Sequence, residues 1–206
     1  MFSRVFESLR PQARTLSALV LFTFAFCAGA AVSELHSGVF DPPRVAPDFS
    51  LKGSDGTDLR LSRYRGKVIA LAFGYTHCPS VCPATLGYLA QVRKKLGAAA
   101  GEFQVLYVTV DPERDDVATM KAFLSSFDPT FVGGTGTARQ LADVRKAYGI
   151  SVSDKIYVET MPKSSYFLDH SSFIYLIDRQ GTLRAMAPFG ESSEDIEHDV
   201  KALLAR

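Results

Sequence analysis

Two uninterrupted apolar runs, at residues 68–75 and 105–110, dominate the alternation of hydrophobic and polar positions along the chain. Runs of this length predict strands that are buried on both faces, as in a parallel sheet. Apolar residues at helical spacing mark four further segments: 84–99, 117–127, 137–148 and about 193–204. Strands that alternate with helices predict the α/β class.

Shorter patterns complete the predicted sheet. Residues 49–51 and 59–61 flank a Gly-Ser-Asp-Gly turn and predict a small hairpin. Further strands are expected at 152–158, 173–177 and 183–187, with a loop over 159–169. This order, with two cysteines directly after the first long strand, favours a thioredoxin-like fold in which helices flank a central mixed sheet.

The N-terminal residues predict a membrane segment. Residues 15–33 carry no charge and follow Arg4, Arg10 and Arg14. As a helix this stretch spans roughly 28 Å, close to the ~30 Å hydrocarbon core of a bilayer. The arginines predict that its N-terminal end stays inside and that the domain lies outside. We expect residues 1–33 to form a signal anchor.

A cleaved signal peptide is the alternative, because residues 28–30 are small enough for a cleavage site. In either case we expect export, most simply to a bacterial periplasm, with the domain held at the cytoplasmic membrane or secreted after cleavage. Residues 34–48 are rich in proline and predict a tether. Residues 49–206 are expected to form the folded domain.

Composition supports one globular domain and argues against one class of partner. The 206 residues are 47% hydrophobic and 22% charged, which is enough for a substantial core. The formal net charge is only +1. Nucleic-acid binding normally requires a concentrated basic surface, so no nucleic-acid partner is expected.

The candidate chemistry lies in Cys78 and Cys82, which are the only cysteines after residue 33. Both precede a proline, and this disfavours a regular helix between them. We expect a turn, with Cys82 near the N-cap and Pro83 at the first helical position. The positive end of the helix then favours thiolates, which can form a disulfide or bind a soft metal.

Two thiolates suit Cu(I) better than structural zinc, which usually has four protein ligands. An imidazole could supply a third ligand, and the candidates are His36, His77, His170 and His198. His198 is expected on a solvated helix surface and His36 in the tether, while His77 adjoins the first cysteine and should point away from it. His170 is the best candidate, although the residues alone leave ligation and a structural hydrogen bond equally open.

Three motifs resemble the Sco/SenC family: GYTHCPSVCP at 74–83, VTVDPERD at 108–115 and DHS at 169–171. The likeness runs over nearly all of residues 45–204, with the motifs in the right order. Members of this family are membrane-tethered, thioredoxin-like copper proteins that assist assembly of cytochrome c oxidase and are linked to the dinuclear copper centre of subunit II. The resemblance therefore implies a copper metallochaperone.

The same resemblance implies that Cys78, Cys82 and His170 bind copper, as Cu(I), Cu(II) or both. The implied partners are cytochrome c oxidase subunit II and other copper carriers. Asp111 should emerge at the same sheet edge as the cysteines, where it could orient their turn or a partner, or cap the next helix. Asp169 could hydrogen-bond the His170 ring.

Two other functions stay open on the residues. A thiol–disulfide oxidoreductase could attack with Cys78, resolve with Cys82 and so reduce the copper-site cysteines of the oxidase. Dedicated enzymes of this fold usually carry Cys-x-x-Cys, so the extra residue here favours copper delivery. A peroxiredoxin-like peroxidase is disfavoured, because that family places Thr or Ser where this chain has Tyr75.

Overall fold

The structure is a computed structural model that describes residues 34–162 and 165–206. The predicted signal anchor or signal peptide, residues 1–33, lies outside the described residues. Within the two described ranges, no helix is both long and apolar enough to span a bilayer.

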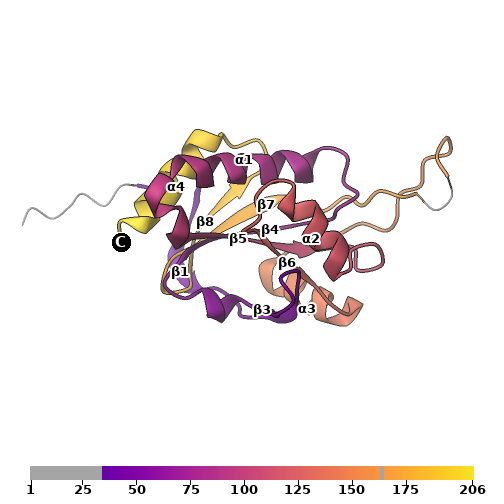
Figure 1. Cartoon of the computed structure of the whole chain (residues 1–206), viewed down its shortest axis with the longest axis horizontal. Coiled ribbons are helices and arrows are strands. Elements are labelled where there is room, and N and C mark those ends of the chain that lie inside the picture. The colour runs from indigo at the N-terminus through magenta and orange to yellow at the C-terminus, as the bar shows by residue number, and fades with distance from the viewer. Residues whose placement is uncertain (1–33, 163–164) are drawn as a thin grey trace, which may run out of the picture. The chain divides into compact units, whose positions relative to one another are not determined.

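A single mixed sheet forms the centre of the described domain (Figure 1). Its strands are β1 (Gly38–Val45), β2 (Ser50–Gly53), β3 (Asp58–Arg60), β4 (Val68–Gly74), β5 (Phe103–Thr109), β6 (Val132–Thr135), β7 (Phe173–Ile177) and β8 (Thr182–Pro188). They lie in the order β1-β8-β7-β4-β5-β6-β2-β3. Strands β4, β5 and β6 are parallel, and the remaining pairs are antiparallel.

Helices cover both faces of this sheet (Figure 1). They are α1 (Val81–Lys95), α2 (Val117–Ser125), α3 (Ala138–Tyr148) and α4 (Ser193–Leu204), with short 3-10 turns η1 (Leu61–Tyr64) and η2 (Gly97–Glu102). Helices α1 and α4 contact each other on one face, and α3 lies on the opposite face. The predicted thioredoxin-like arrangement, a central mixed sheet flanked by helices, is confirmed.

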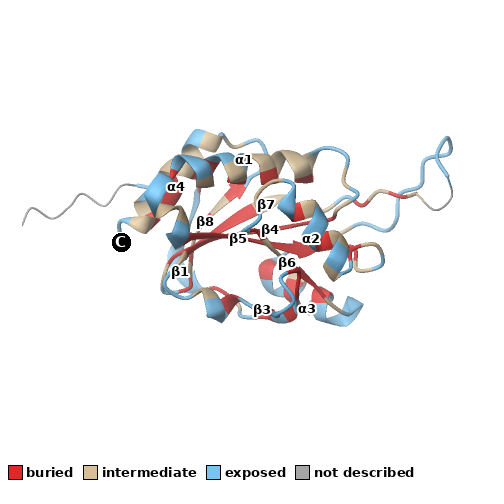
Figure 2. Ribbon diagram, viewed as in Figure 1, coloured by how far each residue is buried: buried red, intermediate tan, exposed pale blue. Residues whose placement is uncertain are grey.

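The core lies along β4 and β5, where every residue is buried (Figure 2). Helix α1 adds Leu86, Leu89 and Val92, and α4 adds Ile196 and Val200, all at helical spacing. The uninterrupted apolar runs of the sequence are therefore the two central parallel strands. Their carboxyl ends carry the residues with candidate chemistry.

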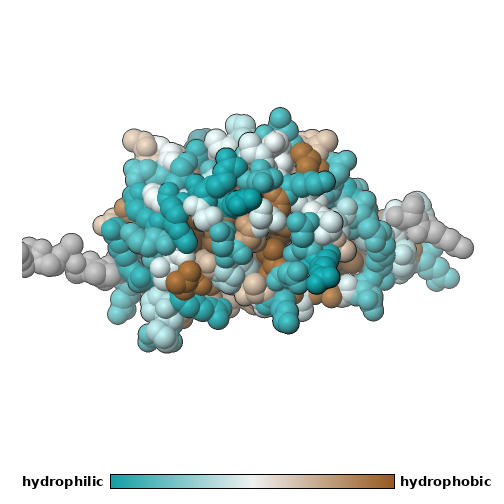
Figure 3. Space-filling view, turned by 90° about the horizontal axis from the view of Figure 1, so that it is seen from below, coloured by the Kyte–Doolittle hydropathy of each residue, from teal (hydrophilic) through white to brown (hydrophobic). Residues whose placement is uncertain are grey.

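The outer surface is mostly polar where Figure 3 shows it. On this face hydrophobic positions form small separate groups among hydrophilic ones. Isolated apolar residues are ordinary on a soluble protein surface.

The N-terminal segment differs from the predicted tether. Residues 38–45 form the edge strand β1, which pairs with β8 from Gly38↔Met186 to Val45↔Thr182. Most of β1 is exposed, so the alternation of buried and exposed residues that marks a strand is missing from its sequence. Pairing with β8, rather than its own pattern, makes it a strand.

His36, which was expected to lack a fixed position, is docked on α4. Its Nδ1 lies 2.7 Å from Asp195 Oδ1, and its ring stacks on His198 with centroids 3.7 Å apart. The buried carboxylate of Asp199 accepts the backbone N–H of both His36 and Ser37, at 2.7 and 2.9 Å. The described chain is therefore anchored from its first residues.

Two further elements differ from the sequence-based prediction. Strand β6 was missed because it is only four residues long and contains two glycines. Residues 152–158 were expected to form a strand, but their pairing consists of the isolated bridges Val152↔His170 and Ile156↔Phe167. Those bridges nevertheless join this segment to the segment that carries His170.

Candidate metal centre

Cys78 and Cys82 lie in the turn from β4 into α1. Helix α1 begins at Val81 with Ser80 at the N-cap, so Cys82 is its second residue and Pro83 its third. The predicted helix start, with Cys82 near the N-cap, was two residues too late. Proline fits here because first-turn N–H groups have no partner within the helix.

The two thiols are free and have different environments. Cys78 is half-buried, whereas Cys82 is buried. A hydrogen bond from the Cys82 thiol, helped by the backbone N–H groups of Cys82 and Ser80, lowers the pKa of Cys78 to about 5. The same hydrogen bond and burial raise the pKa of Cys82. At neutral pH Cys78 is therefore a thiolate and Cys82 a thiol that donates to it.

His170 meets Cys82 although 88 positions separate them. Its Nε2 lies 3.6 Å from Cys82 Sγ. Its Nδ1 lies 2.9 Å from the carbonyl oxygen of Ser171, which can only accept, so Nδ1 carries the hydrogen. The lone pair of a neutral ring is then on Nε2, beside the sulfur.

The sulfur and the imidazole share a small cavity with a tyrosine. Cys82, His170 and Tyr107 all line it, and its volume is only about 10 Å³. A cavity of this size holds a single small species and has no room for an organic substrate. The chemistry that fits is that of an ion or of the sulfurs themselves.

Asp169 does not hold the His170 ring as predicted. The Nδ1 of that ring bonds to the Ser171 carbonyl instead, and both residues lie in the described part of the chain. Asp169 contributes its backbone N–H, which donates to Ser153 Oγ at 3.0 Å. Its place in an extended segment, next to His170, explains why its side chain points elsewhere.

Asp111 orients a different segment from the one predicted. Its carboxylate accepts hydrogen bonds from Arg114 Nε at 2.5 Å and from the Tyr166 hydroxyl at 2.8 Å. It does not cap α2, because Asp116 accepts the N–H of Thr119 there at 2.7 Å. Asp111 therefore fixes the segment that leads to His170 rather than the cysteine turn.

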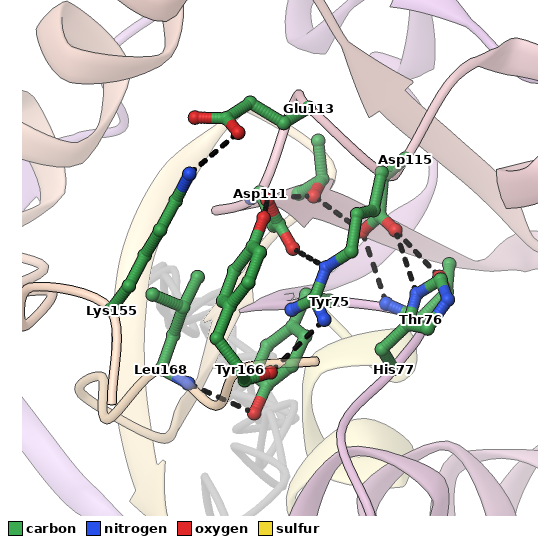
Figure 4. A network of polar contacts seen from close by, with 11 residues as sticks. Tyr75, Thr76, His77, Asp111, Glu113, Asp115, Lys155, Tyr166 and Leu168 are labelled. Carbon is green, nitrogen blue, oxygen red and sulfur yellow. Dashed lines mark hydrogen bonds and ion pairs between the residues drawn. The ribbon is translucent and has the colours of Figure 1, made fainter. Parts of the chain in front are cut away.

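Asp115 holds the cysteine turn, a role that the sequence analysis missed (Figure 4). It accepts the backbone N–H and the hydroxyl of Thr76, at 3.0 and 2.5 Å, and the hydroxyl of Thr109, at 2.6 Å. Burial raises the pKa of this carboxyl, and the three donors oppose the shift. His77 is exposed beside this group, with Nδ1 3.9 Å from Asp115 Oδ1. The sequence did contain a clue to this role, because Asp115 is the last residue of the VTVDPERD motif.

Arg114 connects Asp111 to the segment that precedes His170. Its guanidinium lies 3.6 Å from the centroid of the Tyr166 ring, and Nη1 donates to the Tyr166 carbonyl at 3.0 Å. The Tyr75 hydroxyl accepts the Leu168 N–H at 3.2 Å. The loops after β4 and β5 therefore both position the residues just before His170.

The three predicted copper ligands are only partly gathered. Cys82 and His170 are in contact, while Cys78 Sγ accepts the backbone N–H of Cys82 at 3.4 Å. Among residues 34–162 and 165–206, no three His, Cys, Asp or Glu side chains stand as a formed metal site. A three-ligand centre would add Cys78 Sγ to the Cys82–His170 pair, and the N–H···S bond leaves that sulfur further lone pairs for a metal.

Comparison with known proteins places the chain in a family. Residues 39–205 match the SCO1/SenC family. The mitochondrial SCO2 homolog of Bos taurus is 37% identical over 163 residues, which are 77% of this chain and 59% of the relative. The chain spans 59% to 62% of the length of the mammalian SCO2 relatives it matches.

Solved structures agree with this match. ScoI of Bradyrhizobium japonicum, solved with copper bound, is 34% identical with a TM-score of 0.70, over 78% of this chain and 99% of ScoI. BsSco, described as a member of the Sco family of cytochrome c oxidase assembly proteins, is 23% identical over 79% of this chain and 95% of BsSco, with a TM-score of 0.60, which shows the fold alone. Because the family match covers most of the chain, the protein belongs to the SCO1/SenC family.

Proposed function

We propose that this protein is a copper chaperone, which binds one copper ion through Cys78, Cys82 and His170. The observation that carries the proposal is the 3.6 Å contact between Cys82 Sγ and His170 Nε2, made across 88 positions of sequence. Copper bound to the related ScoI supports copper as the ion.

The spacing of this pair suits two ligands of one metal. Typical bonds are about 2.3 Å to sulfur and about 2.0 Å to imidazole nitrogen. With these lengths, which are those of Zn²⁺, a sulfur–nitrogen separation of 3.6 Å subtends roughly 110–115° at a shared ion. That angle lies between the tetrahedral and trigonal values, so neither side chain needs to move far.

The electrostatics of the pair favour a soft cation. Cys78 is already a thiolate at neutral pH, and Cys82 loses its proton on binding. Thiolate and imidazole together favour copper over hard cations such as Mg²⁺ or Ca²⁺. The small cavity beside Cys82 excludes larger cargo.

Delivery is proposed to proceed by ligand exchange at Cys78. This sulfur is half-buried, while Cys82 is enclosed, so an incoming ligand reaches the copper from the Cys78 side. We propose the copper centre of cytochrome c oxidase subunit II as the recipient. We further propose that residues 15–33 hold the domain at the cytoplasmic membrane, facing the periplasm.

Copper binding to the reduced full-length protein tests the ligand set. We expect one copper per chain, and a loss of affinity of more than about 100-fold in His170→Ala and in Cys78→Ser, beyond the loss for a residue that only supports a ligand. His198→Ala is the matched control and should bind copper as the wild type does. Full affinity in His170→Ala would exclude the three-ligand site.

A thiol–disulfide reductase is the second candidate, supported by the unequal thiols. The half-buried Cys78 thiolate can attack a partner disulfide and form a mixed disulfide, with release of one partner thiolate. Cys82, as a thiolate, then attacks the Cys78 sulfur and releases the second partner thiolate. The partner disulfide is thus reduced by two electrons, and Cys78 and Cys82 are oxidised to a disulfide.

His170 separates the two candidates, because reduction needs no imidazole ligand. In cells that depend on this protein for oxidase activity, the chaperone function predicts loss of activity in His170→Ala as well as in Cys78→Ser and Cys82→Ser. Activity retained only in His170→Ala would establish the reductase. The His198→Ala variant controls for expression and folding.

A further inference from the structure

The hydroxyl of Tyr107 is buried beneath the cysteine pair without a regular partner. Tyr107 lies in β5 and is 1% exposed, and its Oη has no hydrogen bond of regular geometry to the described residues. Buried donors are almost always paired, because an unpaired one costs the free energy of its lost hydration. The unpaired Tyr107 hydroxyl beneath the cysteine pair therefore suggests a partner that is absent from the copper-free state.

The polar group that this hydroxyl adjoins is the sulfur of Cys82. A Cβ added at Gly74 would overlap both Tyr107 Oη and Cys82 Sγ, so the two atoms lie against the same point of the backbone. Tyr107, Cys82 and His170 also line the same small cavity. The hydroxyl is therefore directed at the place where the sulfur and the imidazole meet.

The state of the sulfur decides whether this hydroxyl has a partner. A thiol or disulfide sulfur is a weak acceptor, whereas an anionic sulfur accepts strongly. Metal binding displaces the thiol proton and so makes the sulfur anionic. The Tyr107 hydroxyl therefore makes a strong hydrogen bond only when Cys82 is a thiolate.

We propose that Tyr107 is a positioning residue whose O–H donates to the Cys82 thiolate, holding that sulfur toward His170 and strengthening copper binding. This inference rests on the proposed copper site. Hydrogen bonds to a metal-bound cysteine sulfur also tune the electronic structure of copper sites.

The variant Tyr107→Phe, made in the full-length protein, removes only the hydroxyl. Tyr148→Phe is the matched control, because that buried hydroxyl donates to the Pro47 carbonyl at 2.7 Å. A buried group without a partner contributes nothing to the copper-free fold. Tyr107→Phe should therefore leave the stability of the copper-free protein unchanged or raise it, whereas Tyr148→Phe should lower it.

The metal readouts are affinity and spectrum. We expect Tyr107→Phe to bind Cu(I) about tenfold more weakly in competition with a chelator, the low end for a hydrogen bond to a charged group. With Cu(II), the sulfur-to-copper charge-transfer band should move to longer wavelength, because the sulfur lone pair rises in energy without the donor. Tyr148→Phe should leave both unchanged.

A metal-free readout tests whether the hydrogen bond requires an anionic sulfur. In a glutathione buffer the two thiols lose two electrons and two protons to one oxidised glutathione, which becomes two reduced glutathiones. Tyr107→Phe should leave this equilibrium close to that of the wild type, because the Cys82 sulfur is a weak acceptor both as a thiol and in the disulfide. The control should not shift it.

The outcomes separate this inference from the proposed function. If the wild type binds copper and Tyr107→Phe shows unchanged copper affinity and band position, Tyr107 only fills space and the inference is overturned. If the wild type binds no copper, the proposed chaperone fails and the inference fails with it, whereas a shifted glutathione equilibrium in Tyr107→Phe would overturn the inference alone. A loss of copper-free stability in Tyr107→Phe would also overturn it.

Discussion

Asp115 accepts hydrogen bonds from both the backbone N–H and the hydroxyl of Thr76, at 3.0 and 2.5 Å, across 39 positions of sequence. Thr76 is two residues before Cys78, and Asp115 follows the neighbouring parallel strand β5. The carboxyl ends of parallel strands meet at one sheet edge, which is where this contact is made. The position of the first cysteine therefore depends on a residue from a different motif.

Replacing this carboxylate should loosen the cysteine turn. Asp115→Asn keeps one acceptor oxygen but turns an NH₂ group toward hydroxyl or amide donors, in a fully buried position. We expect a loss of about 1–3 kcal/mol in the free energy of unfolding and weaker copper binding. Urea denaturation and copper competition measure the two effects.

The neighbouring aspartate provides the control. Asp116 is exposed at the N-cap of α2, where asparagine serves as well as aspartate. Asp116→Asn should therefore leave both stability and copper affinity close to those of the wild type. If both variants changed stability and copper affinity equally, Asp115 would not be what positions the cysteine turn.

The sequence predicted the centre of the fold better than its edges. Strands β4 and β5 are buried on both faces, so their apolar runs carry an unambiguous signal. The edge strand β1 has little burial and exists through its pairing with β8, which no local pattern records. Long-range pairing is the information that a local pattern lacks.

The candidate site divides in the same way. The cysteine pair was predictable from its place after a strand, and His170 from the family motif. The sequence could not show that Asp115 holds Thr76, or that Tyr107 lies beneath Cys82, because both contacts cross between elements. Asp169 was predicted to hydrogen-bond the His170 ring because the two residues are adjacent in sequence. The ring bonds to the Ser171 carbonyl instead.

Cys78 should remain a reactive thiolate at pH values where ordinary cysteines are protonated and unreactive. Its pKa of about 5 lies below the usual value of 9.0, chiefly because the Cys82 thiol donates to it. Alkylation of the metal-free reduced protein by iodoacetamide should reach half its maximal rate near pH 5. Cys82→Ala removes the donor and should raise that midpoint, whereas Cys82→Ser keeps an O–H donor and should raise it less.

The same shift predicts how stability depends on pH. Between pH 5 and pH 9 the unfolded chain binds the Cys78 proton and the folded protein does not, so this group stabilises the fold increasingly as pH rises. Its contribution is complete above pH 9 and is lost as pH falls through 5. The pH dependence of unfolding should therefore be steeper in the wild type than in Cys78→Ser, and equal slopes would contradict the low pKa.

Gly74 is required by the close approach of two side chains. A methyl group there would overlap the Tyr107 hydroxyl and stand 2.6 Å from Cys82 Sγ. Gly74→Ala should cost about 1–3 kcal/mol of stability and weaken copper binding, as expected for overpacking of a filled core. Gly87→Ala, in α1 with open space around it, should instead be neutral or stabilising. Unfolding and copper titration of both variants test the difference.

Asp199 should anchor the N-terminal segment without affecting the copper site. Its buried carboxylate accepts the N–H groups of His36 and Ser37, and removing it in Asp199→Ala leaves both donors unpaired. We expect a loss of about 1–3 kcal/mol in the free energy of unfolding and faster limited proteolysis near residue 36. Asp195→Ala, which removes the exposed contacts of that carboxylate with His36 and with the Ser192 hydroxyl, should have a smaller effect on both.

Copper affinity distinguishes anchoring from a wider role for Asp199. The contacts of Asp199 lie between the N-terminal segment and α4, whereas the proposed ligands lie on α1 and before β7. Asp199→Ala should therefore bind copper with unchanged affinity at a temperature where it stays folded. If Asp199→Ala also weakened copper binding, docking of the N-terminal segment would be coupled to the metal site. The prediction that Asp199 only anchors this segment would then be wrong.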